Sequence, residues 1–395
     1  MLLSTVALSL LLVSQGQVHV VDAANGPGTD FTTLGAAVGA ALDGDVVLVR
    51  GGDYFLDGFG TEGIFLDGKG LVVVAEPGAV VRTTRARIRN LPAAGRVLIQ
   101  GLTFTSNEIV ADFDDDAGPL WFERCVFQPQ FDLVAGGVHP TNCATVVLSR
   151  CSLHAVPLIV PSTALRSQNS RLHFYDGTVQ GRATGGLSAA VELGQSSFLE
   201  LFGSDVHGGD GADGNSILFC NGQEGGAALV VAEASTLVRL DSSLVGGAGG
   251  APFSGGCSSG ADGQDLNVVQ GTVVALGGSA RSLEIGSPVR TDEMVVATFT
   301  GLPGDRVWLR FAFLPGPGSF SRFYDGEYLL GMPRFKALVA TIPPSGTLVV
   351  AAAAPQLPPG EESLVAYCQA FFLDAAGQRF VLSSPSALVV IDASF

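Results

Sequence analysis

The middle of the chain repeats an eight-residue unit in which apolar and polar positions alternate, break and alternate again. If the last residue of each unit is position 0, positions −7, −5 and 0 are apolar in every copy. The six copies are VLIQGLTF, LWFERCVF, VVLSRCSL, LHFYDGTV, LELFGSDV and VRLDSSLV, which end at Phe104, Phe127, Leu153, Val179, Val206 and Val245. Alternation on both sides of a break is typical of two short strands joined by a bend.

The ends of successive units lie 23, 26, 26, 27 and 39 residues apart. A period of this size in a β-rich chain predicts coils stacked into a solenoid. We expect the solenoid to span residues 17–282. The six position-0 side chains should then form one internal column.

The segments on either side of the repeat follow other patterns. Leu34, Val38, Ala41 and Leu42 stand at helical spacing after Thr32 and Thr33, which are acceptable N-caps. They predict a short helix that covers the N-terminal end of the solenoid. In residues 283–395 the period disappears, and roughly seven alternating strands separated by Pro/Gly turns predict an Ig-like or FnIII-like β-sandwich.

The stretch that contains DFTTL, AAV, DGD and VRGGDY, between Asp30 and Tyr54, resembles a known class of proteins. It is similar to the opening of secreted right-handed parallel β-helix proteins, the pectin-lyase-like class, and to the start of pectin methylesterases. The resemblance implies a right-handed parallel β-helix. It does not extend to catalysis, because the R-x-P-x-x-R motif, the polygalacturonase stations and the DFIFG-like and LGRPW-like stations are missing. No catalytic residue is therefore assigned.

The first residues suggest export. Leu2–Val13 is an apolar run too short to span a bilayer, and small residues at Ser14 and Gly16 suit signal peptidase. We expect a signal peptide over residues 1–16 and a secreted or cell-surface protein; a first buried strand is the alternative. No later stretch is long and apolar enough for a transmembrane helix.

The charge limits the partners. The net charge of −16, with only Lys69 and Lys336 as lysines, argues against nucleic acid and anionic membranes. The sequence does not indicate the oligomeric state.

The sequence also bears on metal binding. The absence of a CxxC motif or a Cys/His cluster argues against zinc. Calcium stays an alternative, because Asp112–Asp116 offers hard oxygen ligands and GGDGAD at Gly208–Asp213 begins like a calcium-binding repeat, although one copy of that repeat cannot stack.

The cysteines divide into two kinds. Cys125 and Cys151 share position −2, so we expect them to stack inside the coil as two buried thiols, without a bridge. Cys220 and Cys257 instead lie in two Gly-rich insertions, Gly208–Gly226 and Gly246–Gln264. In an exported protein this placement predicts a Cys220–Cys257 disulfide.

Positions −6 and −4 alternate with buried positions and are expected to face solvent. The chemically distinctive residues there are Trp121, Glu123, His173, Tyr175, Glu200 and Phe202. Flat rings beside carboxylates and an imidazole suit sugar rings and their hydroxyls. This face is therefore the predicted glycan-binding site. The alternative is that other parts of the chain cover it, so that its rings form secondary core.

The sequence favours a non-enzymatic exported module that binds a polysaccharide or a cell-surface glycan. One alternative is a divergent polysaccharide lyase or glycoside hydrolase acting on an acidic polysaccharide. Against hydrolysis, Glu123 and Glu200 are expected three coils apart, about 14 Å. Glycosidase carboxyls lie about 5–9.5 Å apart. The second alternative is a structural spacer.

Overall fold

The computed structural model of the protein describes residues 16–55, 63–106, 109–129, 137–155, 162–182, 189–215, 220–321, 323–377 and 379–395. The predicted signal peptide lies outside the described residues, apart from Gly16. No helix in the described part of the chain is long and apolar enough to cross a membrane.

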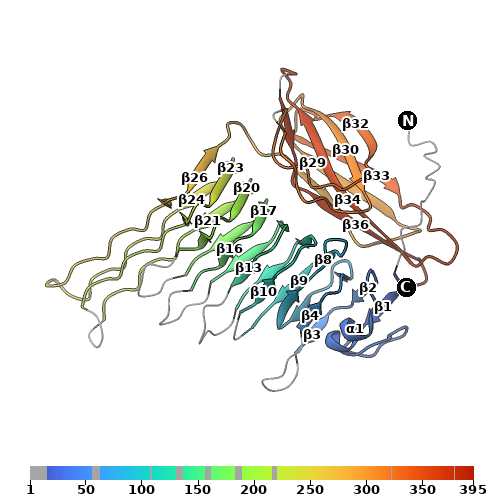
Figure 1. Ribbon diagram of the computed structural model, residues 1–395, viewed down its shortest axis with the longest axis horizontal. Coiled ribbons are helices and arrows are strands. Elements are labelled where there is room, and N and C mark those ends of the chain that lie inside the picture. The colour runs from blue at the N-terminus through green and yellow to red at the C-terminus, as the bar shows by residue number, and fades with distance from the viewer. Residues whose placement is uncertain are drawn as a thin grey trace.

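Successive coils of residues 18–275 build three parallel sheets, which together form a β-solenoid (Figure 1). The ten-stranded sheet contains β1 (Val18–Val21), β2 (Val46–Val49), β5 (Val72–Ala75), β8 (Val97–Gln100), β11 (Leu120–Glu123), β14 (Val146–Ser149), β17 (Arg171–Tyr175), β20 (Phe198–Phe202), β23 (Thr236–Leu240) and β26 (Thr272–Ala275). One eight-stranded sheet contains β4 (Gly63–Asp67), β7 (Arg85–Arg89), β10 (Ala111–Asp114), β13 (Val138–Thr141), β16 (Leu165–Gln168), β19 (Val191–Gly194), β22 (Leu229–Ala232) and β25 (Leu266–Val269). The other contains β3 (Gly52–Tyr54), β6 (Val81–Thr83), β9 (Leu102–Phe104), β12 (Val126–Phe127), β15 (Ser152–His154), β18 (Thr178–Gln180), β21 (Asp205–His207) and β24 (Ser243–Val245).

The break in the repeated unit is a bend of one residue. The backbone is left-handed at position −3 of the first five units and at position −4 of the sixth, with φ between 50° and 76° at Gly101, Arg124, Arg150, Asp176, Gly203 and Asp241. A single left-handed residue turns the chain sharply without ending the strand pairing on either side. In each unit the bend joins a strand of the ten-stranded sheet to one of the second eight-stranded sheet, for example β11 to β12.

The predicted register is confirmed for the first five units and wrong for the sixth. Phe104, Phe127, Leu153, Val179 and Val206 stack on one another through parallel pairing. The next residue of this column is Leu244, because Val206 pairs with Leu244 and Val245 pairs with His207. In this register Arg239 pairs with Leu201 and takes position −5, so the sixth unit departs from the apolar pattern that Val238, Leu240 and Val245 appeared to satisfy.

A short helix, α1 (Leu34–Ala40), covers the N-terminal end of the solenoid. The Thr33 hydroxyl caps it by accepting the N–H of Ala36 at 3.3 Å. Leu34 and Val38 are buried in the inner core of the solenoid. The predicted cap is therefore present.

The C-terminal region forms two further sheets. β27 (Ser282–Ile285), β29 (Met294–Thr300) and β33 (Thr347–Ala353) make an antiparallel three-stranded sheet. The seven-stranded sheet contains β28 (Val289–Arg290), β30 (Arg306–Ala312), β31 (Tyr324–Asp325), β32 (Phe335–Thr341), β34 (Ser363–Leu373), β35 (Phe380–Leu382) and β36 (Ser386–Ile391). Phe299 from the smaller sheet packs in one apolar cluster with Val307 and Phe372 from the larger one.

The C-terminal region lies against the ten-stranded sheet of the solenoid (Figure 1). Trp121, Tyr175 and Phe202 of the solenoid share an apolar cluster with Tyr367 and Val389 of the seven-stranded sheet. The ten-stranded sheet is thus buried on both faces over much of its length: by the solenoid core on one side and by the C-terminal region on the other.

The two Gly-rich insertions form a bundle of extended threads, which projects from the far end of the solenoid (Figure 1). Every third backbone N–H crosses to a neighbouring thread: those of Gly211, Gly214, Gly222 and Gly225 donate to the carbonyls of Ala248, Ala251, Ser258 and Ala261 at 2.7–2.9 Å. Three residues per turn is the repeat of the polyproline II helix. The thread bundle is therefore ordered by hydrogen bonds between threads, since such helices have none within a thread.

Glycine is required in the thread bundle because the threads approach so closely. A Cβ added to Gly222 would lie 1.8 Å from the carbonyl oxygen of Gly250, and one added to Gly250 would lie 2.1 Å from that of Ala212. Both glycines lack the positive φ that usually explains the residue. The predicted Cys220–Cys257 disulfide is present, with its Cα atoms 5.6 Å apart, and it ties the two insertions together.

The cysteines and the candidate calcium-binding aspartates of the sequence analysis contact other protein groups in the structure. Cys125 and Cys151 are buried free thiols. Within GGDGAD, the Asp210 and Asp213 carboxylates accept backbone N–H groups of the adjacent thread at 2.9 and 2.7 Å. Asp112 pairs with Arg89 at 3.0 Å. No group of three potential metal ligands of the His, Cys, Asp or Glu type occurs among the described residues.

Asp116 gives a testable pH dependence. Its carboxyl is fully buried and accepts the N–H of Leu91 at 2.8 Å. Burial raises its pKa to about 6, with Asp114 and Asp115 adding to the rise. Because the unfolded carboxyl titrates near 3.9, the folded protein gains stability as the pH falls from above 6 toward 4.

Replacing Asp116 by Asn should therefore stabilise the protein at pH 8, by roughly 1–2 kcal/mol. The advantage should shrink as the pH approaches 4. Urea unfolding at the two pH values measures both effects, with Asp292→Asn, at an exposed aspartate in the C-terminal region, as the control. An Asp116→Asn variant that is less stable than wild type at pH 8 would contradict this account.

Candidate functional site

The six predicted site residues share one face of the ten-stranded sheet, as the repeat indicated, but they do not face solvent. All are at most 2% exposed, namely Trp121, Glu123, His173, Tyr175, Glu200 and Phe202. The prediction of a solvent-facing groove was wrong, because the C-terminal region packs across these positions. The alternative interpretation, that other parts of the chain cover these positions and their rings form a secondary core, describes the apolar residues of the set.

Trp121 and Glu123 join the solenoid to the C-terminal region. The Trp121 ring meets the edge of Tyr367 with centroids 5.0 Å apart. The Glu123 carboxylate accepts the Ser386 hydroxyl at 2.7 Å and the Ala387 N–H at 2.8 Å. It also pairs with Arg150. Burial raises the pKa of Glu123, but nearby Arg150 and Arg124 outweigh burial and hold it below its ordinary value.

His173, Tyr175 and Glu200 form a second buried polar group. Glu200 contacts His173 Nδ1 at 3.0 Å, accepts the Tyr175 hydroxyl at 2.5 Å and accepts the N–H of Glu327 at 2.9 Å. Burial lowers the pKa of His173, although Glu200 opposes this effect. Burial also raises the pKa of Tyr175 well above its ordinary value. The imidazole–carboxylate contact needed for general base chemistry thus exists, but it has no access to a substrate.

A sequence signal for this covered face was present. All four residues are buried in each of β2, β5, β8, β11 and β14. Runs such as VVLV at Val46–Val49 and VVVA at Val72–Ala75 are nearly continuous in apolar residues, which is typical of parallel strands buried on both faces. The alternation of apolar and polar residues in the central units instead suggested that one face of the sheet is exposed to solvent.

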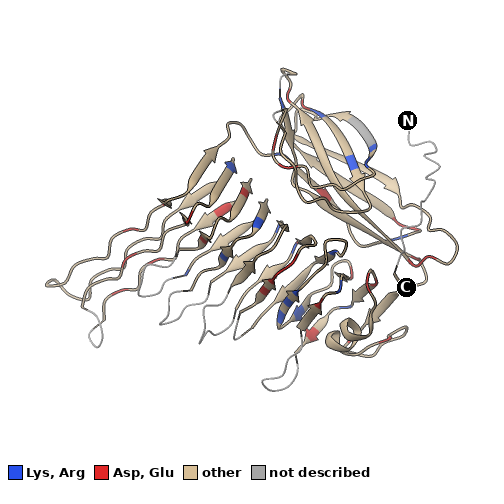
Figure 2. Ribbon diagram, in the orientation of Figure 1, with Lys and Arg blue, Asp and Glu red and all other residues tan. Residues whose placement is uncertain are grey.

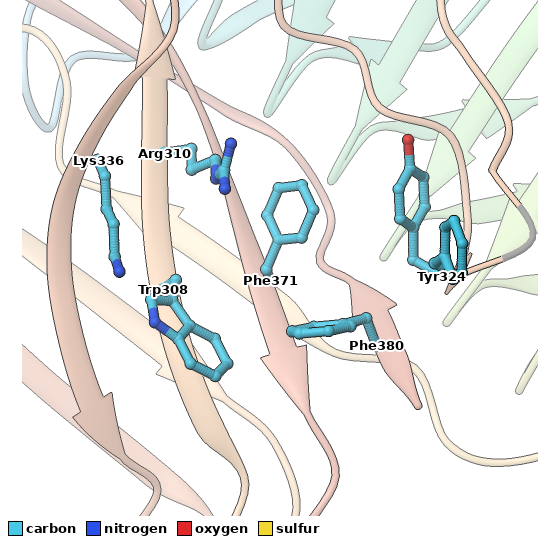
Figure 3. A pocket seen from close by; sticks show the side chains of 7 residues that line it. Trp308, Arg310, Tyr324, Lys336, Phe371 and Phe380 are labelled. Carbon is cyan, nitrogen blue, oxygen red and sulfur yellow. The ribbon is translucent and has the colours of Figure 1, made fainter. Parts of the chain in front are cut away.

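An accessible hollow of about 240 Å³ lies instead on the seven-stranded sheet (Figure 3). We call it the aromatic basin, and its lining residues are Trp308, Arg310, Phe323, Tyr324, Lys336, Phe371 and Phe380. On β30, Arg306, Trp308 and Arg310 alternate with Val307 and Leu309, which pack between the two C-terminal sheets. The alternation turns the basin residues away from that core.

Pairing between strands assembles the basin. Trp308 on β30 stands opposite Phe371 on β34, and Arg310 stands opposite Lys336 on β32. Tyr367, four residues before Phe371 on β34 and therefore on the same face, packs against the solenoid. The basin therefore continues the same face of the sheet beyond the area that the solenoid covers.

Aromatic rings form the floor of the basin (Figure 3). The Trp308 and Phe380 rings lie 5.6 Å apart at 56°, and Phe371 meets Tyr324 edge-on at 5.8 Å. Tyr328 also meets Phe371 edge-on, at 5.0 Å. Because the rings contact one another, each is held in place before any ligand arrives.

Four cationic side chains surround these rings. Each lies near a ring face, with 5.1 Å from Arg306 to Trp308, 4.9 Å from Arg310 to Phe371, 4.2 Å from Arg334 to Tyr328 and 5.8 Å from Lys336 to Trp308. Within the described part of the chain, none of the four forms an ion pair with a carboxylate. By contrast, Arg50, Arg150, Arg171 and Arg281 all pair with carboxylates. Positive charge at the basin is therefore free to meet an anionic ligand.

The chemistry of the basin is that of a binding surface. Its lining residues include no carboxylate, imidazole or thiol. Rings offer apolar platforms, and Arg310 and Lys336 offer hydrogen-bond donors with positive charge. These residues were not predicted from the sequence. The segment RVWLRF at Arg306–Phe311, in which cations and a Trp alternate with core residues, is the sequence pattern that could have indicated them.

A scan of the sequence against protein-family models finds no match, and a search of curated protein sequences finds no relative. Neither comparison therefore connects the basin or the solenoid to a known activity.

Proposed function

We propose that the protein is an exported, non-enzymatic module that binds a glycan through the aromatic basin. The observation that carries the proposal is the cluster of Trp308, Phe371 and Phe380 beside Arg310 and Lys336. Sugar rings pack their C–H faces on such platforms, while nearby donors bind ring hydroxyls and carboxylates. The proposed binding site therefore lies in the C-terminal region and not on the solenoid. The proposed class of ligand, a glycan, is the one that the sequence indicated.

Free cations favour a glycan that carries acidic groups. The chain as a whole has a net charge of −16, so an anionic polymer is repelled by most of its surface. Arg306, Arg310, Arg334 and Lys336 provide a local exception. Their guanidinium and ammonium groups suit carboxylate or sulfate groups on alternating sugars.

Two structural expectations belong to the same proposal. We take the solenoid to be a right-handed parallel β-helix, and the C-terminal region to be an Ig-like or FnIII-like β-sandwich that carries the site. Export is supported by the Cys220–Cys257 disulfide, since such bonds persist mainly in oxidising compartments. The protein then acts outside the cell or at its surface.

Replacing Trp308 by Ala should weaken glycan binding about tenfold, because one aromatic platform is lost. A glycan array first identifies a ligand, and isothermal titration calorimetry then compares the variants. Phe253→Ala is the matched control, since Phe253 is an exposed aromatic residue on a Gly-rich insertion far along the sequence. The control should bind as wild type does, and the melting temperature of both variants should stay near the wild-type value.

Equal binding by wild type and Trp308→Ala would exclude the basin as the site. Arg310→Gln separates the charge requirement, because it should weaken binding of an acidic glycan more than that of its neutral counterpart. A reducing-sugar assay and absorbance for unsaturated uronate run in parallel. Product release would favour the lyase or hydrolase alternative over a binding module.

A further inference from the structure

At its C-terminal end the solenoid is open, in that no further strand among the described residues pairs with its last coil. Each of the three sheets ends there in a strand with one neighbour, namely β24, β25 or β26. At the other end α1 packs against β1, β2 and β4. The backbone N–H and C=O groups on the outer edges of the last strands are available to another chain.

Side chains of the internal columns become exposed at this open end. Val268 on β25 continues the column of Leu193 and Val231, both fully buried, yet Val268 is 46% exposed. Val273 on β26 follows the buried Leu237 and is only partly buried. A further layer of protein would complete the burial of both valines.

The segment that forms the last two strands of the open end lacks charge. From Leu266 to Ala280 the sequence contains no Asp, Glu, Lys, Arg or His. Strand β26 accordingly shows neither blue nor red in Figure 2. Solvent-exposed sheet edges are usually protected by charged residues or proline, and neither occurs in this segment. Copies of a chain with a net charge of −16 repel one another, so a charge-free surface is where two copies can meet at the lowest electrostatic cost.

We propose that the open end is an interface between two copies of this chain, which meet end to end around a two-fold axis. In such a dimer the same apolar surface and the same strand edges face each other, so the interface is self-complementary. Edges related by the two-fold axis run antiparallel, an arrangement that strands accept without a crossover. Head-to-tail stacking would instead place the open end against α1, which leaves no strand edge to pair.

Sedimentation velocity of the full chain tests the proposal, over concentrations up to roughly 100 µM. The mass should rise from that of one chain toward that of two. Val268→Glu or Val274→Glu should weaken the association at least tenfold, because each places two carboxylates near the axis of the dimer. Val349→Glu is the matched control: Val349 is 59% exposed on β33 of the C-terminal region, and its substitution should leave the association unchanged.

Several outcomes would overturn the proposal. One is a wild type that stays monomeric throughout the concentration series, and another is loss of association in Val349→Glu but in neither end variant. Small-angle X-ray scattering adds a shape test, since an end-to-end dimer is much longer than one chain and a side-by-side dimer is not. Circular dichroism checks that each variant is folded, and the two end variants on different strands keep the test valid if one of them unfolds.

Discussion

Replacing Glu123 by Gln is expected to destabilise the protein by about 3–5 kcal/mol. The carboxylate is fully buried between the solenoid and the C-terminal region. It pairs with Arg150 and Arg124, and it accepts hydrogen bonds from the Ser386 hydroxyl and the Ala387 N–H. A neutral amide of the same shape keeps the packing but leaves two guanidinium groups without their counter-charge. Chemical unfolding at pH 7 measures the loss.

Glu192→Gln is the matched control for Glu123→Gln. Glu192 pairs with Arg166 at 3.3 Å on the solenoid surface, and both side chains are over a third exposed. Breaking such a pair should cost less than about 1 kcal/mol.

The pH dependence of stability gives a second test of the role of Glu123. Glu123 has a lowered pKa in the folded state, so its contribution to stability is present above about pH 4.3 and is lost as the pH falls below that value. Similar losses for both variants would mean that Glu123 is not the buried centre of the contact.

Replacing Trp121 by Ala should also cost about 3–5 kcal/mol. The indole is fully buried, and Tyr367 packs edge-on against it from the seven-stranded sheet. Deleting it leaves a cavity at the centre of the contact between the two parts of the chain. The solvent-facing position expected from the sequence would instead give almost no change in the melting temperature, so thermal unfolding distinguishes the two cases.

A Trp308→Ala variant provides the comparison for Trp121→Ala. Trp308 is the other tryptophan of the chain and lies in the accessible basin. Its substitution should lower glycan binding and leave stability nearly unchanged, while Trp121→Ala should do the reverse. If Trp121→Ala had a native melting temperature, the C-terminal region would not cover the solenoid as described.

The architecture of the solenoid was predictable because each coil repeats the same local solution. Apolar residues at positions −7, −5 and 0 gave the strands, and the break between them gave the bend at Arg124 and Arg150. The register failed only in the sixth unit, where the apolar pattern selected Val245 but the strands pair through Leu244, with Arg239 at position −5. There the left-handed residue Asp241, three positions before Leu244, matches the bend of the other units.

The candidate site was not predictable in the same way, because the exposure of a side chain depends on what packs over its face of the sheet. Alternation showed that Trp121 and Tyr175 point away from the solenoid core, but it does not show whether another sheet lies there. The basin has the opposite difficulty. Trp308, Phe371 and Lys336 come together only through pairing of β30 with β34 and β32. These strands carry no repeat, and Phe371 and Lys336 lie 63 and 28 residues after Trp308 in the sequence.

The thread bundle imposes a genetic constraint on a segment that otherwise resembles a flexible linker. Every single-base change in a glycine codon that alters the residue introduces a side chain, and at Gly222 or Gly250 even a methyl group would overlap a neighbouring backbone oxygen. Collagen is subject to the same rule at every third residue. The insertions of this protein should therefore tolerate changes at their aspartates, serines and alanines far better than at these glycines, and a composition that looks relaxed would record strict selection.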